Sequence, residues 1–512
     1  MSAATDIADG HAARRWFWGA LLATFVFRAW LSVVVPFTGD EAYFLVWGQR
    51  PDIGYYDHPP MVGWLLALLA PLSTAEWVLR LPALLLPVLL AFATRASLTL
   101  WFGRSPAIAD LAATLVLLIP MNVWNVLITT DTPLIGFSFA AVVVFARAVE
   151  RVSNPGFLLA GTFLGLAFLS KYFAVLLGFG MIAWALAMRA RQPVWPALGL
   201  VFLGALPAGL VNLYWNCEAC WSNVMFNAIN RHEGSGLSWT NPLLFVAALA
   251  YLAAPLLWFA WRERASLAAS LDSPGRRALL YAWLVPLGIF ALLSPLKKIG
   301  LHWLLSFVPL LVLTLAIALP AEKLRRCVRF LAVFALLHGV LAGVLAAVPL
   351  EAWKSNHLYS RLVLQFRTPE LVEKLAPYRD LVPATDNYTL SSIVSYYAGR
   401  YFFVFGAGTS HARHDDIVTD VRDFAGRDIL VVRRNAPPEQ DYRPYFRSVE
   451  FRTIEVSGVT IHLVLGRGFD YPAYRDGVLK LVRDRWYRIP GLLPVTGCYF
   501  CEKYFPGESC GR

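Results

Sequence analysis

Charged residues are scarce in this chain of 512 residues: Asp, Glu, Lys and Arg make up 15% of it, whereas hydrophobic residues make up 58%. A soluble globular chain carries about 25% charged residues and does not need so large an apolar fraction to bury one core. Internal repeats and low-complexity tracts are also lacking. The composition therefore predicts a polytopic helical membrane protein.

Cysteine is also rare, with six residues in the chain. Cys327 falls in a predicted cytoplasmic loop, and the other five fall in segments predicted to face outwards: Cys217, Cys220, Cys498, Cys501 and Cys510. An oxidising compartment permits disulfides there. The two CxxC pairs also have the spacing of zinc ligands, but a metal site would require the loop and the far C-terminus to meet. Disulfides or free thiols are the favoured interpretation.

Acidic residues are fewer than basic ones: the chain has 34 Asp and Glu and 45 Lys and Arg, which gives a net charge of +11. The basic residues are scattered in short loops between apolar runs, which argues against a nucleic-acid-binding face. Membrane topology and anionic lipids explain them better.

The abundant aromatic residues are typical of rings that anchor helices at membrane interfaces. The first apolar run, 16–36, lacks a clear cleavage site, so we expect it to remain as an anchor.

The apolar runs predict the membrane spans. A spanning helix needs about 20 apolar residues. On that basis we expect eleven spans, near residues 16–36, 77–99, 107–128, 133–149, 156–174, 175–189, 194–214, 241–260, 278–294, 301–319 and 330–349. The run Met61–Ala70 has about half the spanning length, so we expect an interfacial or re-entrant segment there.

The basic loops predict the orientation. With the N-terminus in the cytoplasm, the positive-inside rule is satisfied by the basic loops that then lie inside. The segments expected outside are 37–60, 129–133, 215–240 and 294–302. Counting Met61–Ala70 as a full span would reverse every later loop and put the basic ones outside.

The chain changes character after the last span. Residues 351–512 are more charged and contain short β-type runs, such as Ile429–Val432 and Val459–Val464. We expect two domains: a transmembrane domain over residues 1–350 and a soluble α/β domain over 351–512, in the periplasm. The segment 384–400 carries polar and aromatic groups suited to binding sugars. The same sequence pattern also arises where tyrosines lie on the surface of a β-rich core.

The candidate functional residues begin in the acidic first outer loop, 37–60. Asp40 and Glu41 stand at the outer end of the first span, and Asp57 and His58 stand just before two prolines. Carboxylates so near the hydrocarbon boundary are costly unless they are solvated, paired or used. Ordinary solvated loop carboxylates are the alternative interpretation.

Further charged residues are expected on the same membrane face: Asp131, Lys171, Arg231, Lys297, Lys298 and His302. Each has an ordinary explanation alone. Asp131 suits a helix N-cap followed by proline, Lys171 suits snorkelling, and the paired lysines suit lipid phosphates. Together, these carboxylates and cations are suited to two tasks. One is to deprotonate an acceptor hydroxyl or to bind a metal, and the other is to bind a phosphate. Binding a lipid-linked phosphate would account for cations that oppose the positive-inside bias.

Five motifs, in order, carry a family resemblance: GDEAYF, GYYDHPPM, TTDTPL, GLAFLSKY and SPLKKIGLHWLLSFVPLL. Together they resemble the bacterial glycosyltransferase family 39 proteins, which have the C-type fold shared by protein O-mannosyltransferases and the lipid A aminoarabinose transferases. The resemblance covers the N-terminal domain. It implies transfer of a sugar from a polyprenyl-phosphate donor to an acceptor on the outer face of the bacterial inner membrane. Lipid A, lipopolysaccharide or another envelope glycan is the favoured acceptor, and Ser or Thr of a protein is the other option.

The resemblance also implies roles for single residues. Asp40 looks like the acidic residue of the first loop that serves catalysis by activating the acceptor, with Glu41 beside it, and Asp131 looks like the acidic catalytic residue of the second loop. Asp57 stands where aminoarabinose transferases have a Glu close to a metal, so a divalent cation held by Asp57 is one option. The residues expected to bind substrate are Asp57, His58, Lys171, Arg231, Lys297, Lys298 and His302.

Two positions depart from the family pattern. His58 stands in place of a lysine near the carrier phosphate, which would make direct phosphate binding depend on pH. Trp303 stands where relatives often have Tyr, so a hydroxyl contact is lost, although indole can donate a hydrogen bond. The expected reaction is direct displacement with inversion, because polyprenyl phosphate is a good leaving group once cations neutralise it.

Two other classes of function explain part of the pattern. A transporter or flippase of a lipid-linked sugar also uses many spans and charges, but transporters place charges near the bilayer midplane and often contain repeats. Here the charges fall at the ends of spans. A scaffold protein would use the soluble domain and leave the acidic loop unexplained. An enzyme is therefore the preferred interpretation.

Overall fold

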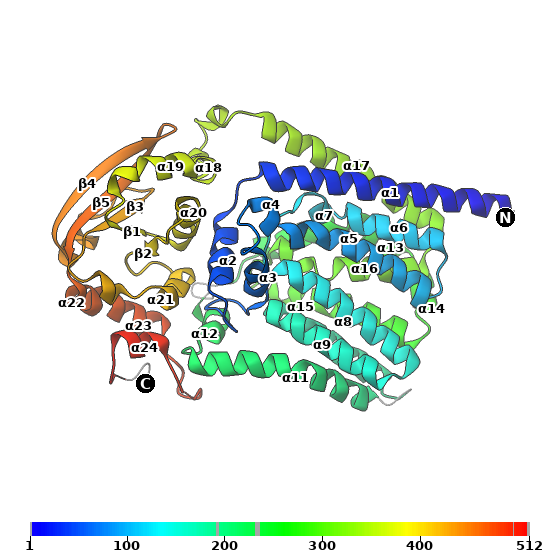
Figure 1. The fold of residues 1–512 in the computed structure, drawn as a ribbon. Helices are drawn as coiled ribbons and strands as arrows, with labels where there is room; N and C mark the ends of the chain where they lie inside the picture. The colour runs from blue at the N-terminus through cyan, green and yellow to red at the C-terminus, as the bar shows by residue number, and fades with distance from the viewer. Residues whose placement is uncertain (1–2, 191–193, 231–235, 495, 509–512) are drawn as a thin grey trace. The chain divides into compact units, whose positions relative to one another are not determined.

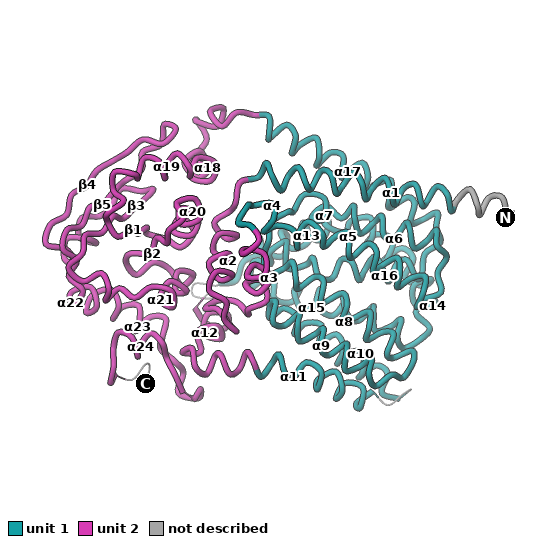
Figure 2. The backbone as a smooth tube through the Cα atoms, viewed as in Figure 1, with its two compact units in different colours: residues 1–35, 73–210, 234–347 teal, residues 36–72, 211–233, 348–512 magenta. Residues whose placement is uncertain are grey.

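The structure, a computed structural model, describes residues 3–190, 194–230, 236–494 and 496–508. The chain divides into two compact units (Figure 2). Unit 1 comprises residues 1–35, 73–210 and 234–347, and unit 2 comprises residues 36–72, 211–233 and 348–512.

Unit 1 is a bundle of apolar helices (Figure 1). Its helices are α1 (Ala3–Val34), α4 (Glu76–Leu79), α5 (Leu81–Ala96), α6 (Pro106–Leu118), α7 (Pro120–Trp124), α8 (Asp131–Arg151), α9 (Asn154–Ser170), α10 (Val175–Met188), α11 (Val194–Glu218, which continues into unit 2), α13 (Thr240–Arg262), α14 (Arg264–Ser270), α15 (Pro274–Leu293), α16 (Val308–Ala318) and α17 (Ala321–Ala347). Shorter turns are the π-helix η1 (Ser97–Trp101) and the 3₁₀-helices η2 (Tyr172–Ala174) and η4 (Leu301–Leu304).

Many of these helices match the expected spans. Within the described residues, eight are long and apolar enough to cross a membrane: Gly10–Val34, Glu76–Trp101, Asp131–Arg151, Val194–Glu218, Thr240–Arg262, Pro274–Leu293, Leu301–Ala318 and Ala321–Ala347. Three shorter apolar helices, Pro106–Leu118, Asn154–Ser170 and Tyr172–Met188, lie at the other expected spans. The helical membrane architecture is confirmed, and the count of eleven spans stays a prediction.

The expected span 107–128 is wrong as a single helix. Helix α6 ends at Leu118, and the short helix α7 starts at Pro120. Proline disfavours helical backbone in the residue before it, and Ile119 is accordingly extended, with φ −52° and ψ 130°. Buried Arg28 of α1 donates to the carbonyl oxygens of Asn122 and Asn125, both at 2.8 Å. The break therefore leaves few backbone groups without a hydrogen-bond partner.

Unit 2 contains a five-stranded mixed sheet. The strand order is β2 (Phe403–Val404), β1 (Val382–Thr385), β3 (Ile429–Arg433), β5 (Val459–Phe469) and β4 (Phe446–Val456). The first three strands are parallel, and β5 pairs antiparallel with both β3 and β4. Strand β3 lies at the centre, which explains why Ile429–Val432 is a continuous apolar run and is wholly buried. The predicted strand runs at Ile429 and Val459 and the α/β class are confirmed.

The helices of unit 2 come from three parts of the chain. They are α2 (Gly39–Gln49), α3 (Met61–Leu69), α12 (Ser222–Ala228), α18 (Tyr359–Phe366), α19 (Thr368–Lys374), α20 (Tyr388–Ala398), α21 (Asp415–Val418), α22 (Tyr471–Tyr474), α23 (Lys480–Trp486) and α24 (Tyr499–Tyr504). Short helical turns are η5 (Leu350–Trp353), η6 (Ala376–Tyr378), η7 (Ser410–His414), η8 (Val421–Phe424), η9 (Glu439–Asp441), η10 (Arg443–Tyr445) and the π-helix η11 (Arg475–Leu479). Helix α3 has nine residues, too few to span a bilayer.

The C-terminal segment of unit 2 begins at residue 348, whereas the expected soluble domain begins at residue 351. The compact unit differs from the expectation because it also includes the segments 36–72 and 211–233. One apolar core contains Trp221 and Met225 of the second segment together with Val431 and Phe405 of the C-terminal domain. The segment 211–233 therefore folds with the C-terminal domain, and the acidic loop belongs to the same compact unit.

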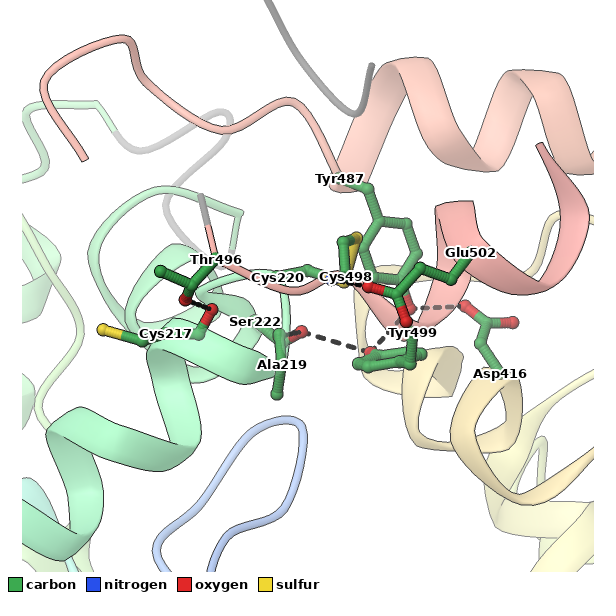
Figure 3. Close-up of a disulfide and its surroundings, with 10 residues drawn as sticks. All are labelled: Cys217, Ala219, Cys220, Ser222, Asp416, Tyr487, Thr496, Cys498, Tyr499 and Glu502. Atoms are coloured by element: carbon green, nitrogen blue, oxygen red, sulfur yellow. Dashed lines mark hydrogen bonds between the residues drawn. A yellow bond between two sulfur atoms is a disulfide. The ribbon is translucent and has the colours of Figure 1, made fainter. Parts of the chain in front are cut away.

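A disulfide joins the segment 211–233 to the end of the chain (Figure 3). Cys220 is bonded to Cys498, and Ala219 pairs with Cys498 as an isolated β-bridge. Close to the disulfide, Ser222 and Tyr487 each hydrogen-bond to the hydroxyl of Tyr499, at 3.1 and 2.9 Å (Figure 3). Cys217 and Cys327 carry free thiols, and Cys510 lies outside the described residues. The disulfide interpretation is thus correct for Cys220 and Cys498, each taken from one of the two CxxC pairs.

Candidate active site

The first turn of helix α2 holds two of the expected catalytic carboxylates. Thr38 caps the helix, since its hydroxyl accepts from the backbone N–H of Glu41 at 3.3 Å. The carboxylate of Glu41 in turn accepts from the backbone N–H and the hydroxyl of Thr38, both at 3.0 Å. This reciprocal capping box fixes the start of the helix. Glu41 is fully buried, and its carboxylate is part of this capping box.

Asp40 is exposed to solvent, unlike Glu41. Its Oδ1 accepts a hydrogen bond from the hydroxyl of Tyr388 at 3.4 Å, near the long limit for such a bond. Surrounding protein removes water from one side of the carboxylate, and this desolvation raises the pKa of Asp40. The bond from Tyr388 lowers the pKa of Asp40, and the charge of Glu41 raises it, but desolvation dominates. A raised pKa and an open side suit a general base.

Asp57 and His58 lie in the loop between α2 and α3. Asp57 is buried, and its Oδ1 accepts from the hydroxyl of Tyr43 of α2 at 3.4 Å. Its backbone carbonyl accepts from Asn227 of α12 at 3.0 Å. The half-buried ring of His58 lies 6.1 Å from that of Trp47 in edge-on geometry. Packing against α2 and α12 thus holds both side chains.

The ring of His414 joins α2 to the C-terminal domain. It lies 5.7 Å from the ring of Tyr43, 5.8 Å from that of Trp47 and 5.6 Å from that of Tyr55. Burial lowers the pKa of His414 to about 3, so the imidazole stays neutral near pH 7. A neutral ring can pack among aromatic rings without the cost of a buried charge.

Asp131, Lys171 and His302 come together in unit 1. Both oxygens of the Asp131 carboxylate accept from Lys171 Nζ, at 2.8 and 2.9 Å, and both side chains are buried. His302 Nε2 lies 4.0 Å from the same carboxylate. The ammonium of Lys171 also lies 5.2 Å from the centre of the Phe173 ring, which packs against Trp303.

This geometry corrects two of the ordinary explanations. Asp131 does not cap α8, because Thr130 occupies the cap position and the Asp131 carboxylate binds Lys171 instead. Lys171 does not extend towards water, because its side chain is buried in the ion pair. A buried charge requires such a partner.

The remaining cations differ in exposure. Lys297 and Lys298 follow helix α15, where Lys297 is half-buried and Lys298 is exposed. The backbone N–H of Lys297 donates to Leu293 at 3.0 Å, which continues the helical turn. Arg231 lies outside the described residues.

A metal site is not formed by any group of three His, Cys, Asp or Glu side chains within the described part of the chain. Asp57 is the expected metal ligand, and its Oδ1 accepts a hydrogen bond from the Tyr43 hydroxyl. A metal at Asp57 stays a prediction, and no chemical step is assigned to it.

Sequence reasoning did not select Tyr388 as a site residue. Tyr388 lies 348 positions after Asp40 in the chain, and no local pattern links the two. The only signal was the mixture of polar and aromatic residues in segment 384–400, which forms the end of β1, a turn and helix α20.

Comparison with known proteins shows what this chain is similar to. Residues 57–215 match the family described as dolichyl-phosphate-mannose-protein mannosyltransferase. The chain is 31% identical, over 251 residues, to the lipid A galacturonosyltransferase RgtD of Rhizobium johnstonii. This alignment covers 47% of the chain and 52% of the relative, so the chain spans about half the length of that protein.

Solved structures show the same fold. ArnT from Cupriavidus metallidurans, in a crystal structure bound to undecaprenyl phosphate, has a TM-score of 0.62 and 15% sequence identity. The apo structure of ArnT has a TM-score of 0.64 and 14% identity. In both comparisons the match covers 88% of this chain and 98% of ArnT. The match thus extends over both units of the chain. The chain thus has the fold of ArnT, and its residues 57–215 match the family described as dolichyl-phosphate-mannose-protein mannosyltransferase.

Proposed function

We propose that this chain is a glycosyltransferase that moves a sugar from a polyprenyl-phosphate donor to a hydroxyl of an envelope glycolipid, with lipid A as the favoured acceptor. The observation that carries the proposal is the Asp40 carboxylate, which is open to solvent, has a raised pKa and lies in the first turn of a helix whose start is fixed by a capping box. The class of reaction comes from the relatives, which include a lipid A galacturonosyltransferase and a protein with this fold bound to undecaprenyl phosphate.

The proposed reaction is a single displacement. Asp40 removes the proton of the acceptor hydroxyl, and the acceptor oxygen forms a bond to the anomeric carbon of the donor sugar. The bond from that carbon to the phosphate oxygen breaks, and its electron pair leaves with the polyprenyl phosphate. The configuration at the anomeric carbon is inverted because no covalent enzyme intermediate forms.

Cationic groups have the second role in this proposal. We assign neutralisation of the leaving phosphate to His58, Arg231, Lys297, Lys298 and His302. Lys171 already shares its charge with Asp131, so we assign this pair the positioning of His302 rather than proton transfer. Asp57 would bind substrate beside His58.

The location follows from the same proposal. The acidic loop and the C-terminal domain belong to one compact unit, which supports their placement on one side of the membrane. The Cys220–Cys498 disulfide supports an oxidising compartment, and for the inner membrane of a bacterium that is the periplasm.

The substitution Asp40→Asn tests the assignment of the base. It keeps the size and the hydrogen-bond acceptor of the side chain but removes the basic carboxylate, so we expect transfer to fall by about 10²–10⁴-fold. The measurement is transfer of labelled sugar from a polyprenyl-phosphate donor to lipid A by the purified protein, with mass spectrometry of lipid A from cells.

The variant Asp52→Asn is a matched control, because Asp52 is an exposed carboxylate of the same loop that accepts from Trp215 and has no proposed chemistry. We expect it to retain activity. Near-normal turnover by Asp40→Asn would refute the proposed role of Asp40.

A further inference from the structure

A polar cavity lies in unit 2 beside the segment that carries Asp40. Its volume is about 440 Å³, within the range of small-ligand sites and large enough for a sugar unit. Its polar lining comes from α18, from the turn and first residues of α20, and from the residues after β3: Arg361, Gln365, Asp386, Asn387, Thr389, Arg434 and Asn435. None of these residues belongs to the site proposed above.

The cavity carries excess positive charge. Asp386 is neutralised, because Arg433 lies 3.2 Å from its Oδ2 and Asn387 donates to its Oδ1 at 2.7 Å. Arg361 and Arg434 form no ion pair with another described residue. Two arginines thus line the cavity without a matching carboxylate, and the guanidinium group is well suited to binding an oxyanion.

Helix α20 adds to this preference. Asn387 caps the helix by accepting from the backbone N–H of Leu390 at 2.9 Å, and Asn387 and Thr389 line the cavity. The partial positive charge of a helix N-terminus stabilises an anion nearby. The side chains of Gln365 and Asn387 and the Thr389 hydroxyl offer the donors and acceptors that sugar hydroxyl groups need.

The wall of this cavity is also the support of Asp40. Gln365 donates from Nε2 to the backbone carbonyl of Phe37 at 2.8 Å. Thr389 packs so closely on Gly39 that a Cβ at Gly39 would overlap with it. Tyr388, between Asn387 and Thr389, donates to the Asp40 carboxylate. A ligand in the cavity therefore lies beside the segment that holds the proposed base.

We infer that this cavity binds an anionic sugar unit of the acceptor, one that carries a phosphate or a carboxylate group, and so presents the acceptor hydroxyl to Asp40. The inference rests on the proposed function for the role of the bound sugar, but the binding itself can be measured without turnover.

The experiment measures binding of three monosaccharides to the full-length Asp40→Asn protein in detergent, by saturation-transfer NMR. The probes are glucose 6-phosphate, glucuronate and glucose, which share a ring and differ in charge. We expect one or both anionic probes to bind at least about tenfold more tightly than glucose, as a charge-assisted hydrogen bond allows. Tighter binding of glucose 6-phosphate would indicate a phosphorylated acceptor, and tighter binding of glucuronate an acidic sugar.

The variants Arg361→Gln and Arg434→Gln locate the binding. Each should lower the affinity for the anionic probe about tenfold. The control Arg475→Gln removes an arginine that pairs with Asp476 and does not line the cavity, so binding should be unchanged. Binding that is absent, equal for the three probes, or unaffected by Arg361→Gln and Arg434→Gln would overturn the inference.

Measurements of turnover distinguish a failure of this inference from a failure of the proposed function. In a background with native Asp40, Arg361→Gln and Arg434→Gln should raise the KM for the acceptor at least about fivefold and leave kcat and the donor KM near their original values. If Asp40→Asn remains active while the arginine variants lose binding, the proposed base fails and the cavity stands.

Discussion

At the scale of single residues, the environment of Asp40 and not its position in the chain makes it a candidate base. Asp40 and Glu41 are adjacent and both begin α2, yet Glu41 is buried in the capping box whereas Asp40 is open and accepts from Tyr388. Two neighbouring carboxylates therefore have different environments, and the proposed function gives them different roles for that reason.

The bond from Tyr388 predicts a change in pH dependence. A base must be deprotonated, so the raised pKa of Asp40 places the acid limb of kcat/KM above the pH of an ordinary aspartate, and activity is lost as pH falls through it. Tyr388→Phe removes an interaction that lowers this pKa, and the acid limb should move to higher pH.

A matched control for Tyr388→Phe is Tyr43→Phe, which removes a hydroxyl that donates to Asp57 and not to Asp40. Its acid limb should keep the position of the original protein. The measurement is the pH profile of kcat/KM between about pH 4 and pH 8, on either side of the ordinary range of carboxylates. An acid limb that stays in place in Tyr388→Phe, or moves to lower pH, contradicts the assignment.

At the scale of elements, the start of helix α2 is the part on which the site depends. The capping box satisfies backbone donors that would otherwise be unpaired, and it sets the direction in which Asp40 leaves the helix. Helix α20 contacts the same turn through Thr389 and Tyr388. One N-terminal turn and one C-terminal helix thus determine where the carboxylate lies.

The substitution Thr38→Ala tests this dependence. Loss of the cap should destabilise unit 2 by about 1 kcal/mol and lower the midpoint of thermal unfolding by about 2–4 °C. We also expect kcat to fall several-fold, because Asp40 is held less firmly. Thr38→Ser retains the hydroxyl and should behave like the original protein in thermal unfolding and transfer assays. Equal behaviour of the Ala and Ser variants would show that the cap does not position Asp40.

At the scale of the whole molecule, the chain consists of an apolar helical unit and a unit in which three separate segments fold together. The segments 36–72 and 211–233 share a compact unit with the C-terminal domain, and the Cys220–Cys498 disulfide links two of these segments. This arrangement gives the C-terminal domain a direct structural role beside the acidic loop, through His414 and Tyr388.

The proposed orientation can be tested by labelling single introduced cysteines in a background that carries Cys217→Ser and Cys327→Ser, which removes both free thiols. Asn435→Cys lies on the exposed surface of the C-terminal domain and should react with a membrane-impermeant maleimide in intact spheroplasts. Glu322→Cys, an equally exposed position in a predicted cytoplasmic loop, should react only after permeabilisation. The reverse pattern would place the acidic loop and the C-terminal domain in the cytoplasm and would contradict the periplasmic site.

The features that the sequence determined by itself are those that depend on neighbouring residues. Runs of apolar residues identified the membrane helices, and the run Ile429–Val432 identified a central strand, because hydropathy and strand propensity act locally. The helix expected over 107–128 is broken at Pro120, because the local effect of proline on the preceding residue overrides the apolar run.

Only the tertiary structure decided which distant residues meet. Asp131 pairs with Lys171, 40 positions away; Cys220 bonds to Cys498, 278 positions away; and Tyr388 reaches Asp40, 348 positions away. No periodicity or spacing encodes such contacts, because they depend on how separately formed elements pack. The acidic loop was recognisable from its residues, whereas its partners in the C-terminal domain and the cavity beside it required the folded chain.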